Sequence, residues 1–330
     1  MAREVGVGRV EWVKTRTIEL ARPVDLRLTC SPLTRGSRDP SNRLDTHELR
    51  RATNTPDGPA TLMVHVDPGA RRAEATAWGP GAGWALAYTP DLIGVDDDIE
   101  LCSDHPAVAA ATARTVGLRI GAARAVSDVV LPTVIDQRVT SVEAKRTWFG
   151  LVRRFGEPAP GPLGLRVPPH PERIGALSDY ERRRHGLELR RGVALVAVAR
   201  ACGRLQRAAD LGSASLQREL QSLPGVGSWT AAITAELVCG DPDVVAVGDW
   251  HLPRQIGWAL AREPRADDVR MLELLEPFRP QRGRVVRTLL AGSDGPPRTA
   301  PRAEISDHVG RDFRGEREYR IRRTLRFDRP

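Results

Sequence analysis

The sequence predicts an α+β fold, in which a small antiparallel sheet domain, residues 1–103, precedes an all-helical domain, residues 104–292. Two observations support this prediction. Segments of the first hundred residues alternate apolar and polar residues between Pro and Gly. Beyond them, apolar residues recur at three- and four-residue spacing. A chain of 330 residues is long enough to bury two such cores.

Strands are expected in three stretches of the amino-terminal region, residues 17–30, 60–68 and 73–80. Each alternates apolar and polar residues or is bounded by Pro and Gly. The intervening residues 34–59 are so polar that we expect a long excursion outside the sheet. This pattern predicts a small antiparallel sheet accompanied by one or two helices.

Helices are expected throughout the second domain. Ser or Asp precedes many of the periodic segments, and Gly or Pro follows them, as at helix ends. The segments are residues 105–118, 127–139, 141–156, 188–206, 215–223, 228–239 and 266–278. The tail that follows, residues 293–330, is rich in Pro and charge, and we expect it to be disordered.

Composition narrows the class of protein. No run of about 18 apolar residues is present, and the amino terminus lacks the apolar core of a signal peptide, so a cytoplasmic protein without a membrane span is expected. The net charge of +8 suits a polyanionic partner, because neutralising phosphates releases counterions. This indication is weak, because Lys14 and Lys145 are the only lysines and the arginine bias is typical of genome composition.

The cysteines give no sign of a metal or disulfide site. Cys30, Cys102, Cys202 and Cys239 are far apart and form no CxxC pair, so neither a disulfide framework nor a zinc or iron–sulfur site is predicted. Buried, reduced thiols are expected instead.

A glycine-containing bend separates two of the expected helices, in the stretch LPGVGSWTAA at residues 223–232. Gly225 and Gly227 lack Cβ atoms and Pro224 fixes φ, so another group can come close to the backbone amides. The second helix begins at this bend with unpaired amides, which form an anion site. A plain helix–helix turn with glycines for packing is the alternative.

A single acid follows in the stretch VVAVGDWHLPRQ, residues 244–255. Asp249 stands after an apolar run and a glycine, at the start of a helical segment, where an N-cap is typical. A fixed carboxylate can also stabilise developing positive charge. The two roles can coexist, because amides at a helix start favour a negative charge. His251 is expected to pack or to face phosphate rather than to act as a base.

These stretches resemble motifs of one enzyme superfamily. LPGVGSWTA is similar to the LPGxGxxTA hairpin of the helix-hairpin-helix DNA glycosylases, and VGDWHLPR is similar to their V-D-x-H-x-x-R segment. LPTVIDQRVTSVEA resembles I-L-G-Q-Q-V-S-x-x-x-A, and FRPQRGRVVRTLL resembles the P-W-R-S-x-A helix. With the sheet domain in front, the resemblance is to the 3-methyladenine DNA glycosylase II, or AlkA-like, branch.

The resemblance implies specific roles. Asp249 matches the catalytic aspartate. The DNA backbone would be held by the hairpin residues Leu223, Gly225, Gly227, Ser228, Trp229 and Thr230. The reaction would need no cofactor, although the hairpin carbonyls could hold a monovalent cation. The partner would be double-stranded DNA with damaged bases, bound by a monomer associated with the nucleoid.

Further residues match the family's wedge and lesion pocket. Ile120 matches the intercalating loop residue, with core packing as the alternative, and Gln137 matches a glutamine near the lesion, with helix capping as the alternative. Trp250 is a further candidate for the lesion pocket, with core packing as the alternative, because it stands in a helical segment. Ile233 and Leu290 occupy positions that are aromatic in the family, and Gln281 also replaces an aromatic residue.

The resemblance also implies a reaction type. Members that cleave the strand use a lysine in the second helix of the hairpin, and the corresponding residue here is Trp229. A monofunctional enzyme that removes alkylated purines, such as 3-methyladenine or 7-methylguanine, is therefore expected. Removal of deaminated, oxidised or bulky bases is one alternative, and a non-catalytic protein that clamps DNA is another.

Overall fold

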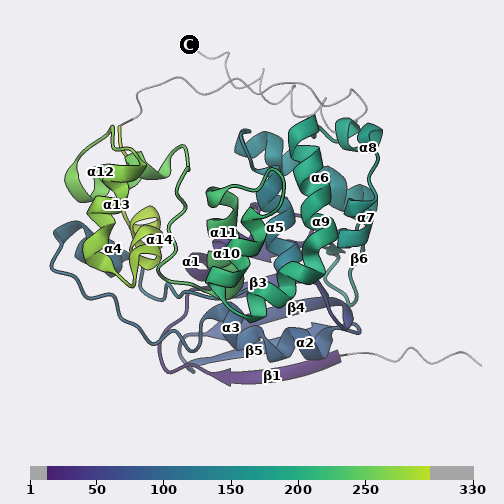
Figure 1. Cartoon of the computed structure of the whole chain (residues 1–330). Helices are drawn as coiled ribbons and strands as arrows, with labels where there is room; N and C mark the ends of the chain where they lie inside the picture. Colours follow the sequence, from purple (N-terminus) through teal and green to yellow (C-terminus); the bar gives the residue numbers. More distant parts are fainter. Residues whose placement is uncertain (1–12, 298–330) are drawn as a thin grey trace, which may run out of the picture.

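The computed structural model describes residues 13–297, and the α+β fold is confirmed. A five-stranded antiparallel sheet lies at one end of the molecule, and most helices stand above it (Figure 1). The strand order is β1-β5-β4-β3-β2. The strands are β1 (Val13–Glu19), β2 (Asn42–Leu44), β3 (Glu48–Thr55), β4 (Gly58–Asp67) and β5 (Arg72–Trp78).

One face of this sheet is apolar because its strands alternate in register. Leu49 of β3 pairs with Val64 of β4, which pairs with Ala75 of β5, and all three side chains are buried. Alternation of period two places such residues on a common face. The small β5 side chains let helix α2 (Ala82–Ala87) pack closely, through its buried Ala82 and Ala85.

The prediction for residues 34–59 was wrong. They contribute the strands β2 and β3 to the sheet and do not form a long excursion outside it. The strand signal was hidden because Arg51 and Thr53 of β3 are polar yet buried. Both side chains donate hydrogen bonds to Asp128, which offsets the cost of burying them. Residues 26–30 were expected in a strand, but they form helix α1 (Leu26–Cys30), capped by Asp25.

The seven helical stretches expected from periodicity are confirmed. They appear as α4 (Pro106–Arg114), α5 (Val126–Ile135), α6 (Ser141–Phe155), α9 (Leu189–Asp210), α10 (Ser213–Gln221), α11 (Ser228–Cys239) and α13 (Asp268–Leu275). The other α-helices are α3 (Thr89–Ile93), α7 (Pro171–Gly175), α8 (Asp179–Arg184), α12 (Leu252–Ala261) and α14 (Arg282–Gly292). A two-stranded sheet, β6 (Glu157–Pro158) with β7 (Arg166–Val167), interrupts a region expected to be purely helical.

Buried apolar residues form two large cores within residues 13–297. The first joins the sheet to helices α5, α6, α9, α10 and α11. The second is made by α4, α12, α13 and α14, together with Ala232 of α11 and Ala246 of the segment before α12. The helical region is therefore divided into two lobes, and one of them shares its core with the sheet. The domain boundary near residue 103 stays a prediction. The expected disordered tail falls, from residue 298 onward, outside the described residues.

The four cysteines are free thiols. Burial raises the pKa of Cys30 and of Cys202 to about 12, so both are expected to be unreactive. Cys102 is exposed, which corrects the expectation of burial for that residue. In the part of the chain described, no helix is long and apolar enough to cross a bilayer, and no group of three or more His, Cys, Asp or Glu residues is placed to hold a metal.

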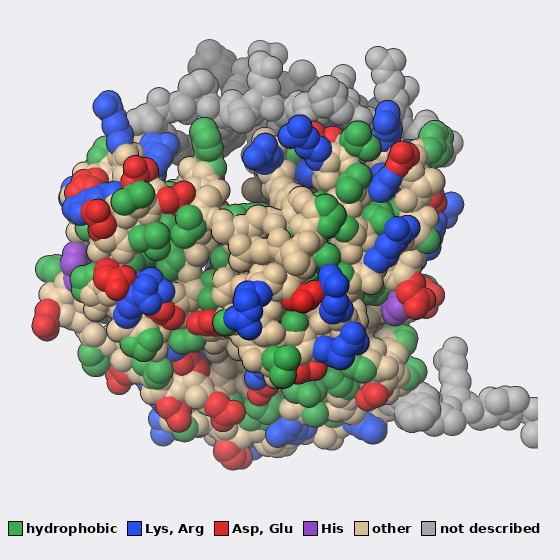
Figure 2. Space-filling view, viewed as in Figure 1, with side chains coloured by type: hydrophobic (Ala, Val, Ile, Leu, Met, Phe, Trp, Pro, Cys, Tyr) green, Lys and Arg blue, Asp and Glu red, His purple; other side chains and the backbone are tan. Residues whose placement is uncertain are grey.

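A hollow lies between the two lobes. Figure 2 shows the surface depressed between the lobe of α12 and α13 and the neighbouring helices α10 and α11, with Lys and Arg side chains on the rim above α6 and α9. A pocket of about 350 Å³ opens beside residues 241–247 of the segment that leads to Asp249, between α10 and α13. Its lining is Gln217, Asp241, Asp243, Val244, Val245, Val247, Leu272 and Arg282.

Candidate active site

The bend between α10 and α11 is packed against helix α9. Gly225 has φ of +78°, and a Cβ atom added to it would lie 2.8 Å from the Ala194 Cβ of α9. Both facts require glycine, because other residues are strained at positive φ and real Cβ atoms do not approach so closely. Val226 is buried and its N–H donates to the Leu223 carbonyl at 3.2 Å. The bend is therefore rigid.

The outer side of the bend presents free backbone donors. A Cβ atom added to the exposed Gly227 would have no neighbour within 4 Å. Within residues 13–297, the N–H groups of Gly227, Ser228 and Trp229 have no hydrogen-bond acceptor. These amides form the first turn of α11, where the helix dipole favours an anion. A phosphate can therefore approach this surface without displacing any side chain.

Gln137 and Thr230 support the bend from behind. The Gln137 side-chain amide donates to the Gly225 carbonyl at 3.0 Å and to the Thr230 Oγ1 at 2.9 Å. Thr230 is only 2 % exposed, so its side chain is not available to DNA. In the structure both side chains hold the bend in shape, and the roles expected for Gln137 near the lesion and for Thr230 at the DNA backbone stay predictions.

Asp249 precedes α12 and is held by three donors. Its Oδ1 accepts the N–H groups of His251 and Leu252 at 2.7 and 2.9 Å. Its Oδ2 accepts the indole N–H of Trp229 at 2.9 Å. The N-cap of α12 is His251, so Asp249 stands two residues before the cap expected for it and accepts the amides that lead into the helix. The residue is half-buried rather than sealed inside the protein. A carboxylate held in this way offers a fixed negative charge.

The segment that carries Asp249 is fixed against the start of α11. The Ser228 hydroxyl donates to the Val247 carbonyl at 3.3 Å. Gly248, at φ of +90°, donates its N–H to the Asp268 carboxylate of α13 at 3.2 Å. The bend and the acid, separated in sequence, are therefore neighbours in space. Asp268 was missed in the sequence, where the pair Asp267 and Asp268 indicates only the start of a helix.

The candidate wedge residue is buried. Ile120 is 7 % exposed, and its N–H donates to the Asp97 carboxylate at 2.7 Å. A side chain that enters DNA must leave the protein surface, so the structure favours the packing alternative for Ile120. Trp250, in contrast, is 85 % exposed and is not a core residue. An aromatic side chain beside the acid is therefore free to meet a ligand.

The two aliphatic candidates for the pocket lie in different settings. Ile233 of α11 is half-buried and contacts both cores, which places it at the seam between the two lobes. Leu290 is 48 % exposed near the end of α14, and Gly292, two residues further, packs on Ala111 of α4. Ile233 is the better placed of the two to line a pocket between the lobes.

Two exposed arginines flank the bend and were not predicted. Arg138 follows Gln137 and has φ of +53°, which is uncommon for a residue with a side chain. Arg190 is in the first turn of α9, and its carbonyl oxygen lies 4.0 Å from the position of a Gly225 Cβ. The neighbouring Arg191 ties α9 to the Ile135 carbonyl of α5. Neither Arg138 nor Arg190 has an ion pair or side-chain hydrogen bond within the described residues.

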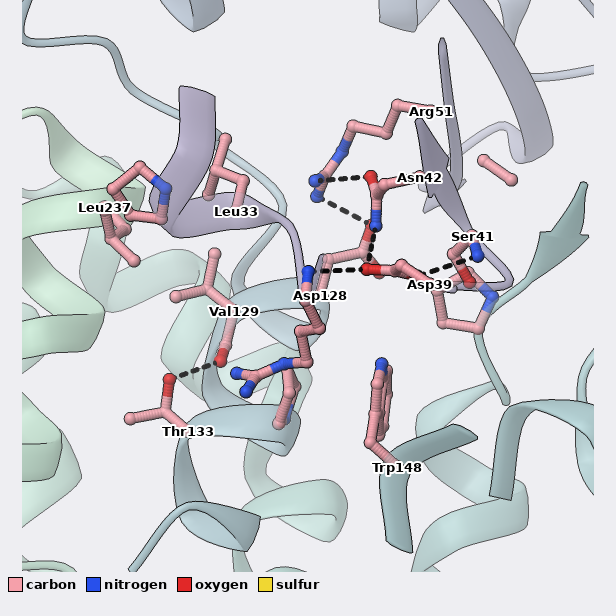
Figure 3. Close-up of a pocket in the computed structure, with 15 residues that line it drawn as sticks. Leu33, Asp39, Ser41, Asn42, Arg51, Asp128, Val129, Thr133, Trp148 and Leu237 are labelled. Carbon is pink, nitrogen blue, oxygen red and sulfur yellow. Dashed lines mark hydrogen bonds and ion pairs between the residues drawn. The ribbon is translucent and has the colours of Figure 1, made fainter. Parts of the chain in front are cut away.

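A second cavity lies away from the bend, between the sheet and helices α5 and α6 (Figure 3). Its volume of about 20 Å³ admits about one water molecule, so a nucleobase does not fit. Arg51 and Asp128 form an ion pair at 3.1 Å beside it. The Ser41 hydroxyl and the Asp128 Oδ1 are buried there without a partner in the described residues. This cavity belongs to the packing of the fold.

No family model and no curated protein matches the sequence. Solved structures do. A 3-methyladenine DNA glycosylase from Archaeoglobus fulgidus superposes with a TM-score of 0.69 at 18 % identity, over 84 % of this chain and 97 % of that one. The 8-oxoguanine glycosylase/lyase of Clostridium acetobutylicum, in its apo form, gives 0.63 at 12 % identity, over 86 % and 98 %.

The same Clostridium acetobutylicum enzyme, in a complex with double-stranded DNA containing cytosine opposite 8-oxoguanine, gives a TM-score of 0.61 at 11 % identity, over 84 % of this chain and 96 % of that one. The chain therefore has the fold of these DNA glycosylases.

Proposed function

We propose that the protein is a monofunctional DNA glycosylase that hydrolyses the bond between a damaged base and its deoxyribose. The observation that carries the proposal is the position of the Asp249 carboxylate, held by Trp229 at the first turn of α11. That turn offers free amides to a phosphate, so a strand bound there would bring its sugars to the acid. Both halves of the chemistry, backbone binding and charge stabilisation, then meet at one place.

The reaction requires the damaged nucleotide to leave the helix, since the bond to C1′ lies inside the duplex. With the phosphate held by the amides of Gly227 and Ser228, the everted sugar would face Asp249. The C1′–N bond breaks with its electron pair going to the base, and the carboxylate stabilises the positive charge on the sugar. Water then adds to C1′ and loses a proton, which leaves an abasic site and a free base.

Alkylated purines are the proposed substrates. A base alkylated at N3 or N7 already carries positive charge and departs neutral, so the site needs no acid to protonate it. Strand-cleaving members of the family that the sequence resembles carry a lysine in the second helix of the hairpin, and Trp229 stands at that position beside Asp249. Strand cleavage through a Schiff base is therefore not expected. The exposed Trp250 offers a π face that attracts a cationic ring.

Two other functions remain as alternatives. Ile233, half-buried at the seam between the lobes, would give the base pocket an aliphatic lining. A pocket lined in this way would also accept deaminated, oxidised or bulky bases. A non-catalytic protein that clamps DNA would need the bend but not the carboxylate. We further propose that the protein acts as a monomer at the nucleoid without a cofactor, and that any monovalent cation binds at the carbonyls of the bend.

The test is release of damaged bases from duplex DNA. We expect the full-length protein to release 3-methyladenine and 7-methylguanine from methylated DNA, and to leave abasic sites that alkali converts to breaks. Without alkali no breaks should appear, and borohydride should trap no covalent complex. Release of only uracil, hypoxanthine or 8-oxoguanine would favour the first alternative. Tight duplex binding with no release from any lesion would favour the clamp.

Substitutions at the two glycines of the bend should separate folding from DNA binding. Gly225→Ala should lower the free energy of unfolding by about 1–3 kcal/mol, because it combines positive φ with a clash against Ala194. Gly227→Ala should leave stability within about 0.5 kcal/mol, because its Cβ meets nothing. It should nevertheless weaken duplex binding roughly tenfold, since the methyl group takes the place of a phosphate oxygen. Chemical denaturation and fluorescence anisotropy measure these two quantities. Normal binding by Gly227→Ala would argue against the phosphate site.

The flanking arginines should contribute to the salt dependence of binding. Arg138→Ala and Arg190→Ala should each reduce the slope of log Kd against log salt by about one, as expected for loss of one phosphate contact. Arg207→Ala is the matched control, because Arg207 is exposed on the same helix as Arg190 but lies roughly 25 Å further along it at 1.5 Å per residue. Equal slopes for all three variants would exclude this part of the interface.

A further inference from the structure

The lone pairs of the Asp249 carboxylate are unequally occupied. Oδ1 accepts two backbone N–H groups, from His251 and Leu252, whereas Oδ2 accepts only the indole of Trp229. A carboxylate oxygen has room for about two hydrogen bonds. Oδ1 is therefore full, and Oδ2 keeps one free position for the reacting sugar or its water.

The orientation of this free position depends on Trp229. Rotation about the Cβ–Cγ bond moves both oxygens, so the amides at Oδ1 and the indole at Oδ2 together fix the plane of the carboxylate. Among the described residues the indole N–H is the only donor at Oδ2, and its direction decides which lone pair of that oxygen stays free. Trp229 is itself held, because it is half-buried against the second core and its backbone belongs to the first turn of α11. The same turn carries the free amides, so the phosphate site and the carboxylate share one rigid support.

We propose that Trp229 is a positioning residue for Asp249, with its indole setting the direction of the free Oδ2 lone pair toward the DNA strand held by α11. This proposal rests on the proposed glycosylase function and deepens it. The Trp229 side chain, which stands at the position of the lyase lysine, would then act on Asp249 rather than on DNA. The backbone N–H of Trp229 remains free for phosphate, so one residue serves both parts of the site.

Two variants separate the donor from the bulk of the ring. Trp229→Phe removes the N–H, whereas Trp229→His places Nε2–H in a five-membered ring at nearly the same reach from Cβ. We expect the single-turnover rate of base release to fall about 10- to 100-fold in Trp229→Phe, and His to restore part of it. The Kd for a duplex with a stable abasic analogue should change less than threefold in both, because binding uses the backbone. A rate in Trp229→Phe equal to that of the native protein would overturn the proposal, as would a His variant no faster than Phe.

A spectroscopic measurement tests the contact without any activity. In a proton–nitrogen spectrum, the indole resonance that disappears in Trp229→Phe identifies Trp229. We expect it downfield, as for a donor to a carboxylate, and shifted upfield in Asp249→Asn. Apart from Trp250, which is the next residue after Asp249, the indole resonances of the other Trp residues should not move. A Trp229 resonance indifferent to Asp249→Asn would refute the contact even if base release is observed. Conversely, a shifted resonance in a protein that releases no base would leave the contact intact and reject the glycosylase function.

Discussion

Asp249→Asn is expected to abolish most base release while leaving DNA binding intact. The variant keeps the size of the side chain and removes the negative charge that faces the sugar. Loss of one preorganised electrostatic group typically costs about 10²–10³ in rate, and loss of a full charge should cost at least this much. Single-turnover release of methylated bases measures it.

The fold of this variant should survive, for a reason visible in the hydrogen bonds. Asparagine keeps a side-chain carbonyl oxygen, which can accept the His251 and Leu252 amides that Asp249 Oδ1 accepts. Its NH₂ group then faces the Trp229 indole, donor against donor. We expect a loss of stability below about 1 kcal/mol, which thermal or chemical denaturation can verify.

Asp268→Asn supplies the matched control. Asp268 lies close to the same segment, where it accepts the Gly248 N–H, and its replacement removes the same charge. If the electrostatic environment in general were responsible, both variants would lose activity alike. We expect Asp268→Asn to retain at least a third of the native rate. Product formation by Asp249→Asn at the native rate would remove Asp249 from the chemistry.

The sequence predicted the helical half well because its apolar period is continuous and its helix ends carry Gly, Ser and Pro. The helix from Ser228 to Cys239 was placed at its observed limits, since the glycines before it end the bend. The strand β3 was missed for the opposite reason. Its buried side chains include Arg51 and Thr53, whose partner Asp128 is distant in sequence, and alternation cannot reveal a polar residue that is paired inside the protein.

The site was predicted unevenly for similar reasons. Asp249 and the glycines carry local signals, a helix start and a bend, and the structure places them together. The contacts of Gln137 and Trp229 cross between distant helices, and a single sequence does not show which way a side chain points. Ile120 and Trp250 illustrate this limit. Both are apolar residues outside regular helix, yet one is buried and the other is exposed.

The largest effect on stability is expected at the ion pair between β3 and α5. Arg51 and Asp128 are 6 % and 3 % exposed and lie 3.1 Å apart. Burial raises the pKa of Asp128, and the Arg51 charge and the Thr53 hydroxyl oppose that rise. The pair thus joins the sheet to the helix that ends near Gln137, and it lines the small cavity of Figure 3. Removing one partner would leave a buried charge without compensation.

We expect Arg51→Leu to lower the free energy of unfolding by about 3–5 kcal/mol at neutral pH. The loss should shrink as the pH falls toward 4. Without Arg51 the folded-state pKa of Asp128 rises further, so the penalty is present above that pKa and disappears when the carboxylate is protonated. Denaturant unfolding at several pH values measures both.

The double variant Arg51→Met with Asp128→Leu distinguishes loss of a pair from loss of packing. With no charge left to bury, most of the stability should return, although the Thr53 hydroxyl loses its acceptor. The exposed pair Arg72–Glu74 is the control, and breaking it should cost less than about 1 kcal/mol. If Arg51→Leu costs no more than that control, the sheet and the helices are not joined through this pair. Asp128 belongs to α5, and just after the end of that helix Gln137 donates a hydrogen bond to the Gly225 carbonyl. In that case the position of the bend relative to the sheet would depend on the apolar core and not on the ion pair.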